Sequence, residues 1–250
     1  MEQNKIKRRF YICFALFPLA AALLSKVFYI VTSLTATDIY YTGAASAFLR
    51  AIPYVCKYAF ILFDQLYVAC AIASVIYAFT YFGKKTAVKA LFCSIGAFVL
   101  SEAVGLVFNL IRNMFSAGRV AASLIALLSE LLFTAAILVS ALMGSSIMLK
   151  HRINSRKRNR AKLYSHYNAA LIPSAVSLSV VLIDLTCFNV VPFLIEYDNI
   201  MPKEIVSIVL DYVYYIGIDF ILTYVLCVVI LFIFVKITGK LKPKESGVLK

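Results

Sequence analysis

The chain has 250 residues, of which 63% are apolar and 15% are charged, and its formal net charge is +13. A soluble globular domain is about half apolar and about a quarter charged, so this composition excludes a water-soluble fold. The positive charge lies almost entirely between long apolar runs, which argues against nucleic acid as a partner. The lipid bilayer is therefore the expected solvent.

The first apolar run spans residues 10–34 and follows a basic start with Lys5, Lys7, Arg8 and Arg9. It is longer than the roughly 7 to 15 apolar residues of a signal peptide. It is also long enough to cross about 30 Å of hydrocarbon at 1.5 Å per residue. We expect a retained first transmembrane helix that Pro18 kinks.

Five more apolar runs follow, and they predict helices at about 52–82, 88–111, 120–149, 169–195 and 204–235. The runs lack the two-residue alternation of barrel strands, and a helix is the open-ended structure that satisfies its own backbone in lipid. The predicted fold class is all-α. Residues 1–250 are expected to form a single integral membrane domain, a polytopic bundle of six transmembrane helices with a basic cytoplasmic loop at 150–168.

The basic residues gather on one side of these helices. Four precede the first helix, three follow the second, seven lie within Lys150 to Lys162 and five follow residue 235, which makes nineteen of the 25. The positive-inside rule places these segments in the cytoplasm and predicts that both termini are inside. With no N-x-[ST] acceptor in the sequence, we expect the plasma membrane, by default a bacterial inner membrane.

No motif typical of catalysis, metal binding or nucleotide binding is present. The six cysteines lie in apolar runs without a C-x-x-C pair, and the two histidines, His151 and His166, lie in the basic loop. There is no P-loop. We therefore expect no metal, no cofactor and no catalytic residues, although an intramembrane enzyme that uses Lys26 or a pair of aspartates stays open.

Ionisable residues nevertheless occur inside every predicted helix. At the bilayer centre each costs at least about 2.5 to 3.5 kcal/mol on insertion scales, so such residues normally face a bundle interior or a wet cavity. On the third helix Glu102 and Asn109 share one face with Gly105. The residues concerned are Lys26, Lys57, Asp64, Glu102, Glu130, Asp184, Asp211 and Asp219.

Depth along the helices selects a candidate substrate or ion site near the midplane, the usual position of such a site in a transporter. Acids outnumber lysines among these residues, so some carboxyls are expected to be protonated or to hold a cation. The candidate site residues are Lys26, Asp64, Glu102, Asn109, Glu130, Asp184 and Asp219.

These features favour a membrane transport protein coupled to protons or cations, with a small solute as its cargo. One alternative is a non-catalytic membrane subunit whose buried charges are structural and whose basic loop, Lys150 to Lys162, docks a protein partner. The layout is similar to that of the substrate-binding subunits of energy-coupling-factor transporters and of small ABC-type permeases, although the similarity covers no specific motif. The same loop is a candidate anionic-lipid patch.

The predicted topology is testable by cysteine labelling in intact cells. In a cysteine-free background, single cysteines at Thr42, Ser116 and Asn199 should react with an impermeant maleimide, because these positions lie in the predicted outer loops. Cysteines at Thr86 and Asn159 should react only after permeabilisation. Labelling of the last two from outside would overturn the orientation.

Overall fold

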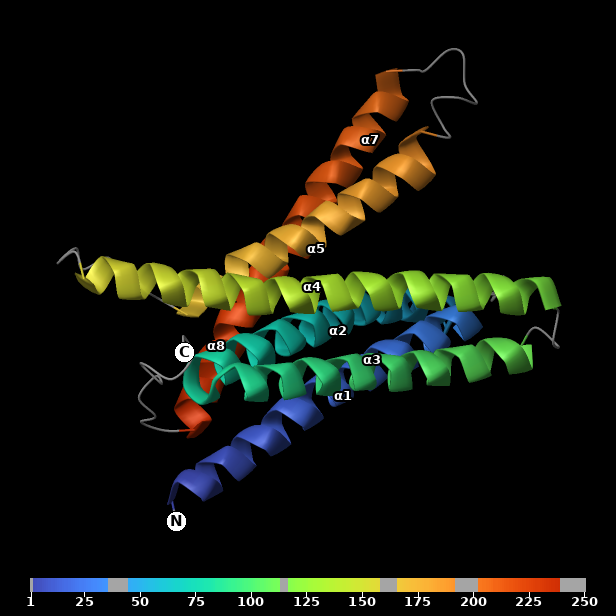
Figure 1. Cartoon of the computed structure of the whole chain (residues 1–250). Helices are drawn as coiled ribbons and strands as arrows, with labels where there is room; N and C mark the ends of the chain where they lie inside the picture. The colour runs from blue at the N-terminus through green and yellow to red at the C-terminus, as the bar shows by residue number, and fades with distance from the viewer. Residues whose placement is uncertain (1, 36–44, 113–116, 158–165, 192–201, 239–250) are drawn as a thin grey trace.

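The computed structural model describes residues 2–35, 45–112, 117–157, 166–191 and 202–238, and these are helical throughout except at Gly83. The elements in chain order are α1 (Glu2–Thr35), α2 (Ala45–Phe82), α3 (Lys84–Arg112), α4 (Ala117–Lys157), the 3-10 helix η1 (His166–Ala170), α5 (Leu171–Asp184), the π-helix η2 (Leu185–Val190), α7 (Pro202–Tyr215), the π-helix η3 (Ile216–Leu222) and α8 (Thr223–Thr238). Figure 1 shows their arrangement.

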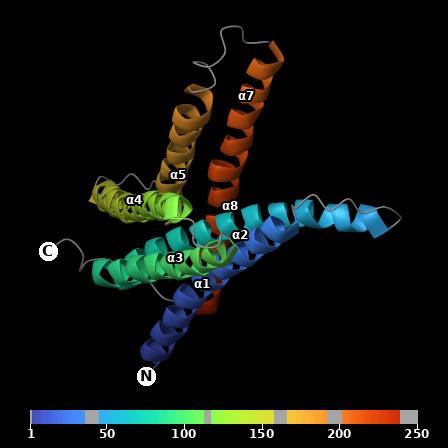
Figure 2. The ribbon, with the colours of Figure 1, turned by 90° about the vertical axis from the view of Figure 1, so that its right-hand side faces the viewer.

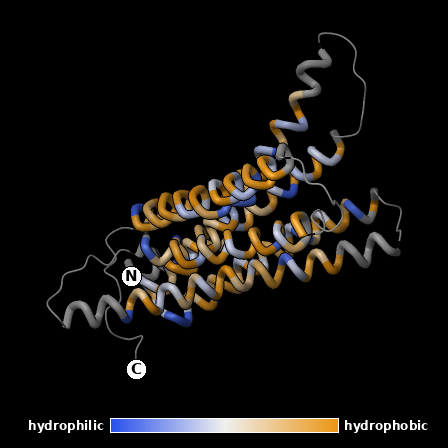
Figure 3. The backbone as a smooth tube through the Cα atoms, turned by 90° about the horizontal axis from the view of Figure 1, so that it is seen from above, coloured by the Kyte–Doolittle hydropathy of each residue, from blue (hydrophilic) through white to orange (hydrophobic). Residues whose placement is uncertain are grey.

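The predicted all-α bundle is confirmed for this part of the chain. Six helical stretches are long and apolar enough to cross a membrane, the last of them formed by α7, η3 and α8 together. Hydrophobic residues dominate these stretches in Figure 3. The start of α1 and the end of α8 lie toward the same end of the molecule (Figure 1), as an even number of spans requires. Which end faces the cytoplasm stays a prediction.

Helices extend into the first four connections that the sequence predicted, most clearly after α4 and between α2 and α3. Helix α4 continues to Lys157, so the first part of the expected loop 150–168 is helical. Lysine and arginine are good helix formers, and their charge is favourable at a helix C-terminus. Between α2 and α3 the turn is Gly83 alone, with φ at 94°. Its N–H donates to the Ala78 carbonyl at 3.0 Å, which closes the end of α2.

Helix α2 is the centre of the bundle. It packs against α1, α3, α4 and α8, and 56% of its most apolar stretch is buried, compared with 11% for α4. Every residue from Ala69 to Thr80 is buried. Alanine, serine and cysteine are frequent in this segment, and such small side chains let neighbouring helices approach closely in a membrane.

An aromatic cluster joins α1, α2 and α8 toward the Gly83 end of the bundle. The ring of Phe10, which is completely buried, stacks on Tyr77 at 4.9 Å and lies 6.1 Å from Phe234 in an edge-on arrangement. Phe82 approaches the same ring at 4.8 Å. Such aromatic pairs contribute about 0.5 to 1.5 kcal/mol each beyond their burial. This cluster therefore anchors one end of the three helices.

Helices α5 and α7 form a pair that diverges from the other spans. Figure 1 shows α2, α3 and α4 extending across the picture with α1 inclined to them, and in both Figure 1 and Figure 2 α5 and α7 rise away from these helices together. A 2.5 Å hydrogen bond joins the hydroxyl of Thr186, in the π-helix η2 that continues α5, to the hydroxyl of Tyr212 in α7. From α7 the chain continues through η3 into α8, which packs against α2. A cavity remains between α2 and the α5–α7 pair.

The packing of α4 on α5 predicts a sensitive glycine. A Cβ at Gly144 would lie 3.1 Å from Cδ1 and 3.3 Å from Cβ of Ile172, and 3.4 Å from the Ala169 carbonyl oxygen. We expect Gly144→Ala to lower the thermal midpoint in detergent, because overpacking costs about 1 to 3 kcal/mol.

Gly96→Ala is the matched control, since a Cβ at Gly96 would meet nothing within 4 Å. Both changes gain the same helix propensity, so the difference between them isolates the contact. Equal midpoints for the two variants would contradict the close approach of α4 to α5 and η1.

Candidate functional site

A cavity of about 280 Å³ lies beside α2, roughly halfway along it. Ionisable side chains reach it from five elements: Lys26 from α1, Asp64 from α2, Glu102 from α3, Glu130 from α4 and Asp219 from η3. Asp64 interacts electrostatically with all four of the others. The structure therefore brings together five of the seven residues that the sequence selected.

Lys26 and Glu102 form an ion pair between α1 and α3. Both side chains are largely shielded, with exposed fractions of 16% and 14%. The Lys26 ammonium also lies over the Tyr29 ring, 5.6 Å from its centroid, in a cation–π contact. Gly105 leaves room for the lysine stem, because a Cβ there would lie 3.6 Å from Lys26 Cδ. The Lys26 ammonium therefore already has two partners, the Glu102 carboxylate and the Tyr29 ring.

The carboxyls of Asp64 and Glu130 differ from that of Glu102 in their contacts. Within the residues that the structure describes, neither carboxyl forms an ion pair or a hydrogen bond. Asp64 is half-buried and Glu130 is exposed, and both line the cavity. Lys26 offsets part of their charge at a distance, and Glu102 opposes it. The cavity consequently holds an excess of negative charge whenever its carboxyls are ionised.

Asp219 is held by a side chain that the sequence analysis did not select. Gln65 donates from Nε2 to Asp219 Oδ1 at 2.8 Å, and the Thr223 hydroxyl donates to Gln65 Oε1 at 2.5 Å. All three residues are buried. Asp219 belongs to η3, and π-helical turns inside longer helices are often found at functional sites. The hydrogen bonds of Gln65 therefore join η3, the π-helical part of the last span, to α2.

Gln65 does not belong to the helical stripes of charged and small residues from which the site was predicted. As the residue after Asp64, it lies about 100° away around the helix and outside that stripe. An amide in the middle of an apolar run was the available signal. Its bonds to Asp219 and Thr223 depend on η3 packing against α2, which spacing along the chain does not reveal.

A second and larger cavity, of about 860 Å³, lies between α2 and the α5–α7 pair. The two cavities share the lining residues Phe60, Asp64, Gln65, Val181 and Asp219, so they meet at these side chains. The larger cavity also contains Lys57, Tyr58, Asp211, Tyr214 and Tyr215. Lys57 and Asp211 are exposed. Asp64 and Asp219 of the acidic centre therefore line both cavities.

The remaining two predicted site residues lie elsewhere. Asp184, at the end of α5, is exposed, and Asn109 is half-buried near the end of α3. Neither lines the two cavities described above.

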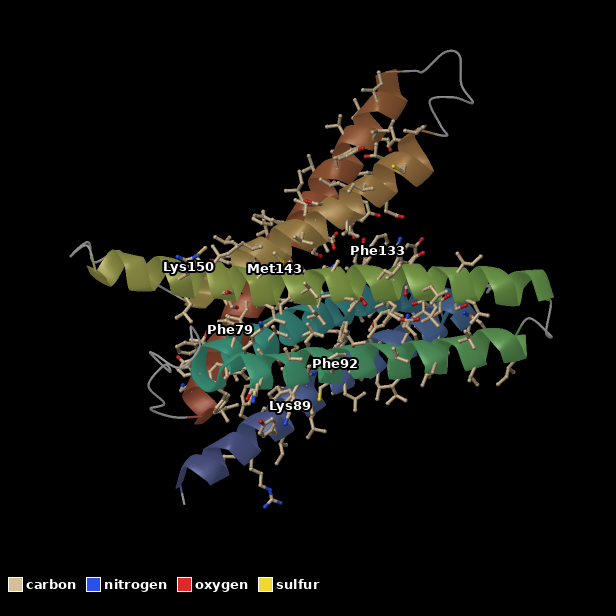
Figure 4. The ribbon with its side chains drawn as sticks, in the orientation of Figure 1. Phe79, Lys89, Phe92, Phe133, Met143 and Lys150 are labelled. Carbon is tan, nitrogen blue, oxygen red and sulfur yellow. The ribbon has the colours of Figure 1, made fainter. Side chains whose placement is uncertain are left out.

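Two hydroxyls complete the smaller cavity, Ser177 from α5 and Thr134 from α4. Figure 4 shows Phe133, the neighbour of Thr134, nearer the start of α4 than Met143 and Lys150, and Lys150 lies toward the end of the bundle that contains Phe79 and Lys89. The acidic centre is therefore displaced from the basic end of the molecule. On α2, Asp64 and Tyr77 are separated by roughly 13 residues, or about 20 Å at 1.5 Å per residue.

Comparison of the chain with models of known protein families, with curated proteins and with solved structures gives no match. The chemistry of the cavity residues is therefore the basis for assigning a function.

The Lys26–Glu102 pair generates a stability prediction. Lys26→Met should lower the thermal midpoint in detergent, because removing one partner of a buried pair leaves an uncompensated charge and costs roughly 3 kcal/mol. The double variant Lys26→Met/Glu102→Gln should recover most of the loss. Lys57→Met, which removes an exposed lysine from the neighbouring helix, is the control and should change little. A double variant as unstable as the single one would contradict the pairing.

Proposed function

We propose that the protein is a membrane transport protein that carries a small solute or cation through the cavity beside α2. The observation that supports this most directly is the meeting of Asp64, Glu130 and Asp219 in one cavity with a single amine that is already paired with Glu102. Carboxyls in such a place are stabilised by protons, by cations or by basic partners. Protons and cations bind reversibly, which is what coupled transport requires.

The surroundings of the cavity support the same proposal. Transporter sites commonly lie near the bilayer midplane at irregular helices, and Asp219 belongs to the π-helical turn of the last span. The larger cavity between α2 and α7 shares Asp64 and Asp219 with this centre and is also lined by the exposed Lys57 and Asp211, which supports a path from the centre to the surface. A movement of the α5–α7 pair relative to α2 would change the access to Asp64 and Asp219, which both cavities share.

A membrane subunit of a larger transporter is the second candidate. It is favoured by α4, which buries little of its surface in this chain and continues as a helix to Lys157 through the start of the basic segment. A partner on the cytoplasmic side would find positive charge there. Removal of residues 150–162 distinguishes the two cases, because a self-sufficient carrier should retain flux and a docked subunit should lose it. We place either form in a plasma membrane, by default a bacterial one.

The transport proposal predicts gradient-dependent flux from the purified protein. Proteoliposomes on a solid-supported membrane should give transient currents when a pH or sodium gradient is imposed, alone or with a panel of small amines, amino acids, sugars and organic acids. Asp64→Asn and Glu130→Gln should reduce the current to the level of protein-free liposomes, because an amide keeps hydrogen bonding but loses the exchangeable charge.

Asp184→Asn is the matched control, since it neutralises an acid of the membrane-spanning region that lines neither cavity. It should retain most of the current. A well-folded wild type without current under any gradient would overturn self-sufficient transport. Equal loss in the Asp64→Asn and Asp184→Asn variants would remove the cavity from the mechanism.

A further inference from the structure

We propose that the smaller cavity beside α2 binds an organic ammonium ion, with Asp64 and Glu130 as its counter-ions and Ser177 as a hydrogen-bond acceptor. This inference rests on the proposed function and specifies the class of solute. It is carried by three independent observations: two carboxyls that form no ion pair or hydrogen bond within the described residues, an unused buried hydroxyl, and the size and aromatic lining of the cavity.

The charge balance favours a cation. Glu102 is neutralised by Lys26, and Asp219 accepts a hydrogen bond from Gln65. Asp64 and Glu130 have no such partner among the residues that the structure describes. An isolated carboxylate in a low-dielectric environment is unfavourable unless a cation or a proton accompanies it. A ligand that brings one positive charge between α2 and α4 would neutralise one of these two carboxylates, and a proton on the other would complete the balance.

The hydroxyl of Ser177 points to the same cavity. Serines on this helix usually return their hydroxyl to the backbone, as Ser174 does to the Ala170 carbonyl and Ser179 to the Ala175 carbonyl, both at 2.8 Å. Ser177 is 4% exposed, lines the cavity and forms no hydrogen bond within the described part of the chain. Its oxygen is also not sealed inside the protein, as those of Ser25 and Ser94 are. It is therefore available to accept an N–H from a ligand.

The size and lining of the cavity favour an organic cation over a bare metal ion. Its volume of about 280 Å³ approaches the roughly 300 Å³ at which small-molecule sites begin, and at about 30 Å³ per water molecule it exceeds the needs of a single ion. The rings of Phe60, Phe98 and Phe133 line it beside the carboxyls. Aromatic faces attract ammonium groups and accommodate their apolar substituents. A primary amine with a small apolar body fits this combination.

Isothermal titration calorimetry on the purified full-length protein in detergent tests the inference with three probes of one shape: benzylammonium, neutral benzyl alcohol and anionic benzoate. Protein-free micelles correct for partitioning. Benzylammonium should bind about tenfold or more tightly than benzyl alcohol, because its charge pairs with unneutralised carboxyls. Benzoate should not bind. Equal affinity of the unmodified protein for benzylammonium and benzyl alcohol would by itself overturn the proposal.

Variants then locate the binding. Asp64→Asn and Glu130→Gln should each weaken benzylammonium binding by about tenfold or more, which corresponds to roughly 1.4 kcal/mol. Asp184→Asn should leave the affinity within about twofold, because Asp184 lies outside both cavities. Unchanged affinity in a folded Asp64→Asn/Glu130→Gln double variant would overturn the site.

Ser177→Ala and Ser179→Ala form a matched pair on α5. Loss of the free Ser177 hydroxyl should weaken binding by about threefold to tenfold, whereas Ser179 already bonds to its own helix and its loss should have no effect. Equal effects of the two changes would contradict the assigned role of Ser177.

Binding and flux separate this inference from the function on which it rests. Gradient-driven current with sugars or organic acids, together with no benzylammonium binding, would overturn the ammonium site and leave transport standing. Carboxyl-dependent benzylammonium binding without current in a folded preparation would support the site and overturn self-sufficient transport.

Discussion

The free-energy cost of ionised groups in hydrocarbon is the constraint on which the arrangement of this bundle depends. An uncompensated charge cannot remain on a lipid-facing surface without a large penalty, so it must find a partner, a proton or water. Lys26 and Glu102 meet this constraint by pairing between α1 and α3. Asp219 meets it through Gln65, which joins α2 to η3. The charges thereby decide which faces of four helical elements turn toward one another.

Helix α2 provides the frame for these contacts. Its buried half near Gly83 packs through small side chains and through the aromatic contacts of Phe10, Tyr77 and Phe234. Its other half contributes Asp64 and Gln65 to the cavities. A single helix thus combines a tightly packed apolar end with a polar half that is less closely packed. This division leaves the polar half free to bind a ligand while the apolar end maintains the association of α1, α2 and α8.

The position of the α5–α7 pair leaves one side of the acidic centre without a close-packed helix. Because these helices diverge from the others (Figure 2), the acidic centre is bordered by a second cavity instead of by a close-packed helix. Ser177 and Val181 reach the smaller cavity from α5, while Asp184 at the end of the same helix remains exposed. The two π-helical segments, η2 and η3, lie in this part of the structure. Of these two segments, η3 lines the larger cavity through Ile218 and Asp219.

The sequence by itself determined the membrane-spanning class, the six helices and most of the ionisable residues of the cavity, because the length of an apolar run and the cost of an intramembrane charge are local properties. It also predicted that Lys26, Asp64, Glu102, Glu130 and Asp219 face inward, since lipid is unfavourable for each residue individually. Only the tertiary structure decided which of them meet. Asp184 has the same local chemistry as Asp64, yet the divergence of α5 and α7 leaves it outside the cavities. Gln65 carries no charge and so gave a weak sequence signal, but the packing of η3 on α2 made it the partner of Asp219. Such pairings depend on the direction and rotation of neighbouring helices, which result from contacts between residues far apart in the chain.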